Sequence, residues 1–150
     1  MFHNEGGRYF REASAALGPS FAVKDAGRAL ASADYDNDGD VDLLVTTEAG
    51  RPRLLRNEGD NQQHWLLIQL VGARQRDALG ARVVVIAGGL RQLRERQSGG
   101  SYLASHDPRL HFGLGQATRA EVEVYWPDGQ VQKLSGVPAD QLLRLVQPAR

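Results

Sequence analysis

Apolar and polar residues alternate in short runs along much of the chain, and turn-forming residues separate the runs. The segment 121–126 is the clearest case, because valine or tryptophan occupies every second position between glutamate and tyrosine. A period of two is typical of half-buried β-strands. It predicts strands over 65–70, 81–87, 92–97, 109–112, 121–126, 131–134 and 142–146. No segment has the period of a long amphipathic helix, so an all-β fold is expected.

A Pro-Asp-Gly sequence at 127–129 follows the clearest of these strands. Proline and glycine favour tight turns, so 121–126 and 131–134 are expected to pair as a β-hairpin. Alternation places Trp126 on the same face as the valines, which predicts that its ring is buried. Tyr125 belongs to the opposite face and is expected to be more exposed.

The first 63 residues predict a smaller sheet. Apolar runs at 28–33 and 41–47 flank an aspartate-rich segment, and a third apolar piece follows at 53–56 after a turn with glycine and proline. This order predicts a strand, a loop and two further strands in one antiparallel sheet. A sheet of this size exposes its edges and one apolar face. It therefore needs a partner: the second half of the chain, another copy, or neighbouring units of a longer protein.

An internal repeat and a change of charge both divide the chain. The tripeptide Asn-Glu-Gly at 4–6 recurs at 57–59, and such recurrence is typical of propeller blades or solenoid units. Residues 1–63 contain 7 basic and 11 acidic residues, whereas 64–150 contain 11 basic and 7 acidic residues. We therefore expect two units, over 1–63 and 64–150, in a chain long enough to bury a core.

Composition excludes several classes of function. The chain has no cysteine, so it has no disulfide, thiolate zinc site or cysteine nucleophile. A formal net charge of +0 and few aromatic residues argue against a nucleic-acid surface, although Arg91, Arg94 and Arg96 are expected to form a small basic patch. No signal peptide or membrane span is visible, because no apolar run is long enough for either.

Aspartates occupy every second position of one short segment: Asp34, Asp36, Asp38, Asp40 and Asp42. Calcium takes about six to eight oxygen ligands, and a tightly coiled loop can aim alternate side chains at one ion. The spacing assigns the first three carboxylates to ligand positions one, three and five. The main-chain carbonyl of Asp40 takes position seven, and Asp42 takes position nine directly or through water. With Gly39 making the sharp turn, the segment predicts a bound Ca²⁺.

Two features separate this loop from a helix-loop-helix calcium site. Position twelve holds Val45 instead of a bidentate glutamate, and the flanking runs at 28–33 and 41–47 have strand character. The ion is therefore expected to hold a β-hairpin together. The alternative is a solvated acidic loop, which is disfavoured because neighbouring carboxylates repel one another unless a cation neutralises them.

These motifs resemble FG-GAP or VCBS repeat proteins that carry an ASPIC/UnbV domain, and the resemblance covers nearly the whole chain. The aspartate loop with the Leu-Leu-Val after it is similar to the calcium hairpin of an FG-GAP repeat, and 53–59 looks like the strand that closes one. The ASPIC/UnbV resemblance is carried by 64–66 (His-Trp-Leu), 76–83 (Arg-Asp-Ala-Leu-Gly-Ala-Arg-Val), 100–103 (Gly-Ser-Tyr-Leu), 109–115 (Arg-Leu-His-Phe-Gly-Leu-Gly) and 126–129 (Trp-Pro-Asp-Gly).

The resemblance implies a β-propeller-like blade followed by an antiparallel β-sandwich-like domain. It also implies a secreted, surface-exposed or periplasmic protein with an adhesive or matrix role, and it implies no established reaction. We therefore expect a non-enzymatic module with structural calcium that binds a protein or glycan partner. Nucleic acid and membrane insertion are not expected.

Two other functions remain open. In the first, the chain is a structural part of a larger β-propeller with no ligand of its own. In the second, it is an enzyme domain that acts on a carbohydrate or small metabolite. An enzyme of this kind needs carboxylates at a catalytic separation, and outside the calcium loop the candidates are Asp77, Glu95, Asp107 and Asp128.

The histidines could bind a metal or act in catalysis, and the aromatic residues could bind a sugar. His111 is expected to be a structural histidine satisfied by a hydrogen bond, because the spacing of the histidines matches no metal-ligand motif. An aromatic platform for a sugar is the alternative to core packing for Trp65, Tyr102, Tyr125 and Trp126.

Overall fold

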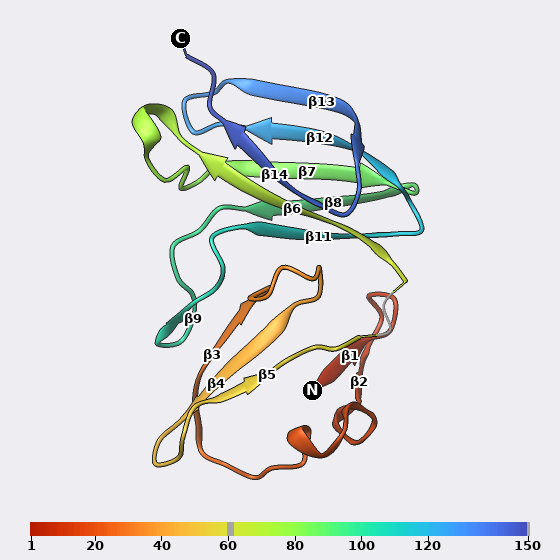
Figure 1. Cartoon of the computed structure of the whole chain (residues 1–150), viewed down its shortest axis with the longest axis vertical. Helices are drawn as coiled ribbons and strands as arrows, with labels where there is room; N and C mark the ends of the chain where they lie inside the picture. The colour runs from red at the N-terminus through yellow and green to blue at the C-terminus, as the bar shows by residue number, and fades with distance from the viewer. Residues whose placement is uncertain (60–61, 150) are drawn as a thin grey trace.

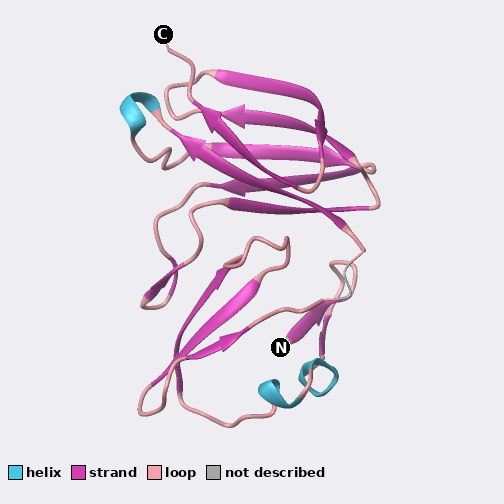
Figure 2. Cartoon of the chain, viewed as in Figure 1, coloured by secondary structure: helices cyan, strands magenta, loops and turns pink. Residues whose placement is uncertain are grey.

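The computed structural model describes residues 1–59 and 62–149, and it is built from β-strands and short 3₁₀-helices (Figure 2). Figure 1 shows two units, the N-terminal one in red to yellow and the C-terminal one in green to blue. The all-β prediction is confirmed. Within the described ranges, no helix has the length and apolar character needed to cross a membrane.

The N-terminal unit contains two small sheets. Its elements are β1 (Phe2–Asn4), β2 (Phe10–Glu12), η1 (Ser14–Leu17), η2 (Pro19–Phe21), β3 (Gly27–Ala33), β4 (Asp42–Thr47) and β5 (Arg53–Leu55). β1 and β2 pair as an antiparallel hairpin, and β3, β4 and β5 form an antiparallel sheet in that order. The strand-loop-strand order around the aspartates and the third strand are therefore confirmed.

The C-terminal unit is a two-layer sandwich. Its elements are β6 (His64–Val71), η3 (Ala73–Gln75), β7 (Arg82–Ala87), β8 (Leu90–Glu95), β9 (Gly100–Ser101), β10 (Ala104–Ser105), β11 (Leu110–Gly115), β12 (Arg119–Tyr125), β13 (Val131–Pro138) and β14 (Gln141–Val146). One layer has the order β13-β12-β7-β8 and the other β11-β6-β14 (Figure 1). All the strands predicted for this half occur, with ends shifted by a few residues.

The hydrophobic core lies between these two layers. β6 contributes Leu66 and Ile68, β11 contributes Phe112, and β7 and β12 contribute valines at alternate positions. Trp126 is buried at 3% exposure and Tyr125 is half-buried, in agreement with the alternation of the sequence. The predicted hairpin is also confirmed, as β12 pairs with β13.

One strand pair differs from the antiparallel arrangement that the resemblance implies. β14 runs parallel to β6, with Leu143 opposite Ile68. The short connection at 139–140 carries the chain from β13 in one layer to β14 in the other. Because β14 then pairs with a strand from the start of the unit, no hairpin dictates its direction.

The N-terminal unit has no buried apolar layer among the described residues. Over 1–59 and 62–149, every buried apolar side chain lies between Leu66 and Leu145, in the C-terminal unit. Leu44 and Leu54 lie opposite each other on β4 and β5 and are exposed, as expected for a small sheet with an uncovered face. The stability of this unit therefore depends on its loops and on its contacts with the sandwich.

The two units meet where the β9–β10 hairpin and the segment after it lie beside β3 (Figure 1). The Asp107 N–H donates to the Ser32 carbonyl at 3.0 Å, which ties this segment to the end of β3. The division into units over 1–63 and 64–150 stays a prediction. Of its residues, 60, 61 and 150 lie outside the described ones.

Candidate metal centre

The aspartate-rich loop joins β3 to β4 at the end of the sheet nearest the sandwich (Figure 1). The pairing of Ala33 with Asp42 closes the loop at its base. Within it the backbone takes positive φ values, +62° at Asn37 and +98° at Gly39. Asparagine and glycine tolerate this left-handed region, so the local sequence suits the tight coil.

Asp34 and Asp42 are each 2% exposed and hold the loop in shape. The carboxylate of Asp34 accepts the N–H groups of Asp38 and Gly39, both at 3.1 Å. The carboxylate of Asp42 accepts the N–H of Tyr35 at 3.1 Å and the N–H that follows β5, from Asn57, at 2.8 Å. These bonds link the start of the loop, its turn and the third strand.

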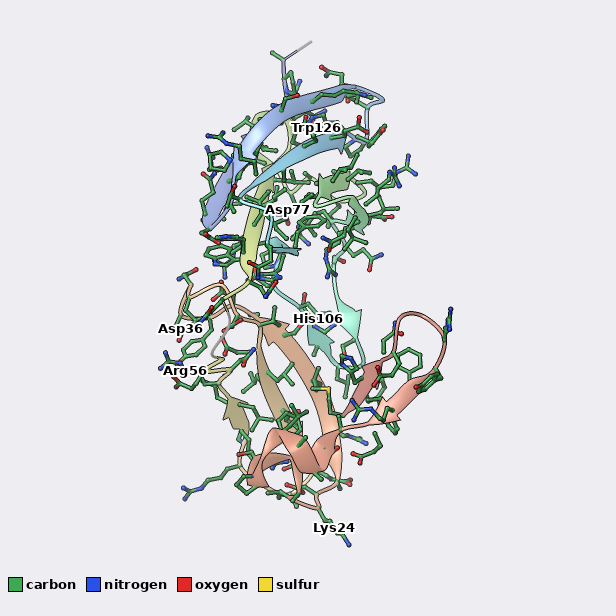
Figure 3. All side chains as sticks on the ribbon, turned by 90° about the vertical axis from the view of Figure 1, so that its right-hand side faces the viewer. Lys24, Asp36, Arg56, Asp77, His106 and Trp126 are labelled. Carbon is green, nitrogen blue, oxygen red and sulfur yellow. The ribbon has the colours of Figure 1, made fainter. Side chains whose placement is uncertain are left out.

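Asp36 lacks such bonds. Both of its carboxylate oxygens are buried and accept no hydrogen bond in the structure. Arg56 Nε lies 2.7 Å from Asp36 Oδ2, which is an ion-pair contact without hydrogen-bond geometry. Figure 3 shows Asp36 and Arg56 next to each other, at the end of the unit opposite Lys24. The nearby carboxylates, Asp36 above all, raise the pKa of Arg56.

The three carboxylates converge. One oxygen from each of Asp34, Asp36 and Asp42 lies within 4.8 Å of the other two. Two oxygens bound to the same calcium ion at about 2.3–2.6 Å can be no more than roughly 4.6–5.2 Å apart, so the separation fits a shared ion. Hard divalent cations prefer carboxylate oxygens, and each oxygen that accepts an N–H retains a further lone pair. The cluster can therefore hold a metal ion.

The remaining two aspartates are placed differently. Asp38 is exposed, and its Oδ1 accepts the Asp40 N–H at 2.9 Å. Its Oδ2 lies 4.0 Å from Arg56 Nη2. Asp40, whose main-chain carbonyl is the predicted ligand, is half-buried. The carboxylates that cluster among the described residues are those of positions one, three and nine, and the ligand roles of Asp38 and Asp40 stay predictions.

Residues of the sandwich contact this loop from the other side. Arg109 Nη2 donates to the Asp34 carbonyl at 2.6 Å, and Arg109 Nη1 donates to Asn37 Oδ1 at 2.5 Å. His111 Nε2 donates to the Gly39 carbonyl at 2.7 Å, which confirms the expected hydrogen-bonded histidine. The sequence named Arg109 only within a motif and predicted a hydrogen bond for His111 without its partner, and nothing in the motif pointed to the loop.

Glycine at position 39 has a second role besides the turn. A Cβ at this position would lie 2.0 Å from Trp65 Nε1, so the indole of β6 packs directly on the loop backbone. The Trp65 ring also stacks on His111, with centroids 6.4 Å apart and an interplanar angle of 13°. The turn glycine is thus also a point of direct contact between the units.

The carboxylates considered for an enzyme are in part engaged by arginines. Asp107 pairs with Arg109 at 2.6 Å, and Asp77 lies 3.6 Å from Arg96. Hydrogen bonds to Asp107 are the main cause of the raised pKa of Arg109. Two of the four candidate carboxylates are therefore partners of arginines.

The predicted basic patch is wrong in its geometry. On β8, Arg91 lies opposite Ile86 and Arg94 opposite Val83, so the two arginines belong to opposite faces of the sheet. Arg94 packs over the ring of Phe112 at 5.8 Å. Arg96 is buried beside Asp77.

The four aromatic side chains do not share one exposed platform. Trp126 belongs to the core, and Trp65 packs on the loop. Tyr102 is exposed and Tyr125 is half-buried with its hydroxyl donating to Glu123. The structure therefore favours packing over a sugar platform for the two tryptophans.

Both halves of the chain match known protein families. Residues 72–150 match the family described as "ASPIC and UnbV", and residues 26–63 match the FG-GAP repeat. The chain is similar to cartilage acidic protein 1 of Homo sapiens, at 33% identity over 123 residues, which cover 77% of this chain and 18% of the relative. The corresponding proteins of Mus musculus and Xenopus tropicalis are 33% and 31% identical over 122 residues. The chain spans 18–19% of the length of these relatives.

Proposed function

Because the chain belongs to the ASPIC and UnbV family and carries an FG-GAP repeat, we propose that it is a non-enzymatic, calcium-binding module that works outside the cytoplasm. Asp34, Asp36 and Asp42 supply carboxylate ligands from the β3–β4 loop. Asp38 and the main-chain carbonyl of Asp40 complete the set in the order that a calcium loop requires. The bound ion would supply the positive charge that lets these groups lie close together.

The state of Asp36 carries this proposal. Its two oxygens are buried, accept no hydrogen bond and lie beside two other buried carboxylates. A buried carboxylate is unfavourable unless hydrogen bonds or a cation compensate it. Arg56 is close to half exposed. An ion pair with so exposed a partner offsets little of the free-energy cost of burying the Asp36 carboxylate. Coordination of a divalent cation is the compensation that fits oxygen ligands at these separations.

The role proposed for calcium is structural. The N-terminal unit has no buried apolar side chain among its described residues, so a metal that joins β3, β4 and the turn replaces part of a missing core. Calcium is present at about millimolar concentration outside cells, where even a weak site of roughly 10⁻⁴–10⁻³ M is occupied. An extracellular, cell-surface or periplasmic location suits such a site, and the ordered surface would then serve adhesion to a protein or glycan partner.

Titration calorimetry on chelator-stripped protein tests the proposal. We expect about one Ca²⁺ per chain with a Kd of about 10⁻³ M or tighter, and loss of binding in Asp36→Asn. Asp25→Asn serves as the matched control, because it removes a carboxylate of the same unit outside the loop. No binding to the unaltered protein at several times this concentration would sink the calcium function.

A second candidate is a structural role within a larger propeller. The face with Leu44 and Leu54 is apolar and exposed, and the chain covers only 18–19% of its relatives. Exposed apolar sheet faces favour association with further strands or copies. Light scattering after size exclusion separates the two roles. Oligomers or aggregates would support a structural part that packs against neighbouring propeller units, whereas a monodisperse monomer would support an autonomous module.

A further inference from the structure

We propose that the sandwich forms part of the calcium site, with Arg109 and His111 as positioning residues that hold the β3–β4 loop in its ligand-binding shape. Neither residue is a metal ligand in this proposal. Calcium affinity then depends on docking of the two units, and docking depends on calcium. The inference rests on the proposed calcium function and adds the residues that regulate it.

Arg109 binds the loop on both sides of Asp36. It precedes β11, and its guanidinium donates to the Asp34 carbonyl at 2.6 Å and to Asn37 Oδ1 at 2.5 Å. Asn37 has a φ of +62°, a left-handed conformation that asparagine tolerates, and the hydrogen bond from Arg109 holds its side chain in place. One planar group thus holds the residues before and after the carboxylate that lacks hydrogen bonds.

Asp107 holds Arg109 in place. Its carboxylate accepts from Arg109 Nε at 2.8 and 3.0 Å and from Nη2 at 2.6 Å. Its own N–H donates to the Ser32 carbonyl at the end of β3. Both side chains are mostly buried, so little solvent screens or loosens the pair. The pair adds no net charge beside the loop, which means that it acts through geometry.

His111 and Trp65 hold the other flank of the loop. The Gly39 carbonyl can only accept a hydrogen bond, so the Nε2 atom of His111 carries the proton at 2.7 Å from it. Trp65 stacks on His111 and packs on Gly39. Gly39 lies between the ligand residues Asp38 and Asp40. The sandwich therefore contacts the loop both before its turn and at the turn itself.

This arrangement lowers the ordering needed when an ion binds. A free loop loses conformational entropy when its ligands gather around an ion. A loop already held by outer hydrogen bonds loses less. Outer-shell partners of metal ligands change affinity by about 10–100-fold when they are removed. Linkage is reciprocal, so the ion must strengthen the contact between the units by the same factor.

The double variant Asp107→Asn/Arg109→Gln tests the inference without changing the net charge. We expect its calcium Kd to rise by about 10–100-fold with the stoichiometry unchanged. The matched control is Glu123→Gln/Lys133→Gln, which removes an ion pair of 2.6 Å on β12 and β13 and should leave the Kd unchanged. His111→Phe keeps a ring beside Trp65 but removes the hydrogen bond to the Gly39 carbonyl. If the double variant does not fold, the calcium Kd of His111→Phe tests the inference instead.

Amide hydrogen exchange supplies a readout other than affinity. Calcium should slow exchange at 106–111 in the unaltered protein, although those residues bind no ion, and should fail to do so in the double variant. Unchanged affinity in both the double variant and His111→Phe overturns the inference while leaving the calcium function intact. Failure of the unaltered protein to bind calcium overturns the calcium function first, and the inference with it.

Discussion

At the scale of single residues, aspartate serves two purposes within one loop. Asp34 and Asp42 accept backbone N–H groups and so determine the shape of the loop. Asp36 accepts none, and a bound cation would neutralise its negative charge. Replacing Asp36 therefore separates ion binding from loop shape, whereas replacing Asp34 or Asp42 disturbs both.

Gly39 is constrained by its backbone and by its surroundings. We predict that Gly39→Ala lowers the free energy of unfolding by roughly 2–5 kcal/mol, since it adds left-handed strain and a clash with Trp65. Gly129→Ala is the control, because Gly129 has a φ of +88° and no heavy atom within 4 Å of the added Cβ. It should lose only about 1–2 kcal/mol. Urea denaturation measures both, and equal losses would contradict the importance of the Trp65 contact.

At the scale of elements, alternation locates the strands but not their ends. β13 extends to Pro138, beyond the predicted 131–134. Gly136 has a φ of +65°, and the pairing with β12 shifts register between Ala120 and Val122. A β-bulge breaks the period of two while the strands remain paired, so the pattern ends before the strand does.

Glu123 joins β12 to β13 and gives this hairpin a pH dependence. It accepts hydrogen bonds from Lys133 Nζ at 2.6 Å and from the Tyr125 hydroxyl at 2.7 Å. These bonds, that from Lys133 first, lower the pKa of Glu123 below its ordinary 4.5. A carboxyl with a lowered folded-state pKa stabilises fully above its unfolded-state pKa, and this stabilisation is lost as the pH falls through the folded-state pKa.

We therefore predict that Glu123→Gln is less stable than the unaltered protein at about pH 7 and that the difference is smaller at about pH 3. Urea denaturation at the two pH values measures it. Glu95→Gln, at an exposed position on the edge strand β8, controls for the general effect of losing one carboxylate. A difference that stays constant between the two pH values contradicts the assigned cause.

At the scale of the whole molecule, the two units draw their stability from different sources. The sandwich has a core shared between two layers, whereas the N-terminal unit has a charged loop and the contacts of Arg109, His111 and Trp65. Because the core of the sandwich lies within the sandwich itself, the sandwich can stay folded when the N-terminal unit unfolds, which favours separate unfolding of the units.

We predict two thermal transitions, of which the first belongs to the N-terminal unit. Calcium at about 20 times its Kd should stabilise that unit by about 2 kcal/mol and raise the first transition by roughly 5–15 °C, while the second stays in place. Differential scanning calorimetry with calcium and with chelator measures this. A single transition that moves as a whole with calcium would contradict separate stabilities.

The sequence by itself determined the features that neighbouring residues encode. Strand positions, the hairpin with its buried Trp126 and the strand-loop-strand order around the aspartates follow from a period of two and from turn chemistry. The aspartate spacing also predicted a ligand set of five residues, which includes the three whose carboxylates cluster. Such patterns act over a few positions, so one chain is enough to recognise them.

Only the tertiary structure decided which residues surround the loop. Arg109 lies 75 positions from Asp34 and His111 lies 72 from Gly39, and both reach the loop only because the sandwich core fixes the start of β11. The parallel course of β14, the separation of Arg91 from Arg94 and the exposure of Asp38 were decided in the same way. Contacts over these distances result from the packing of many side chains at once, and no local pattern specifies them.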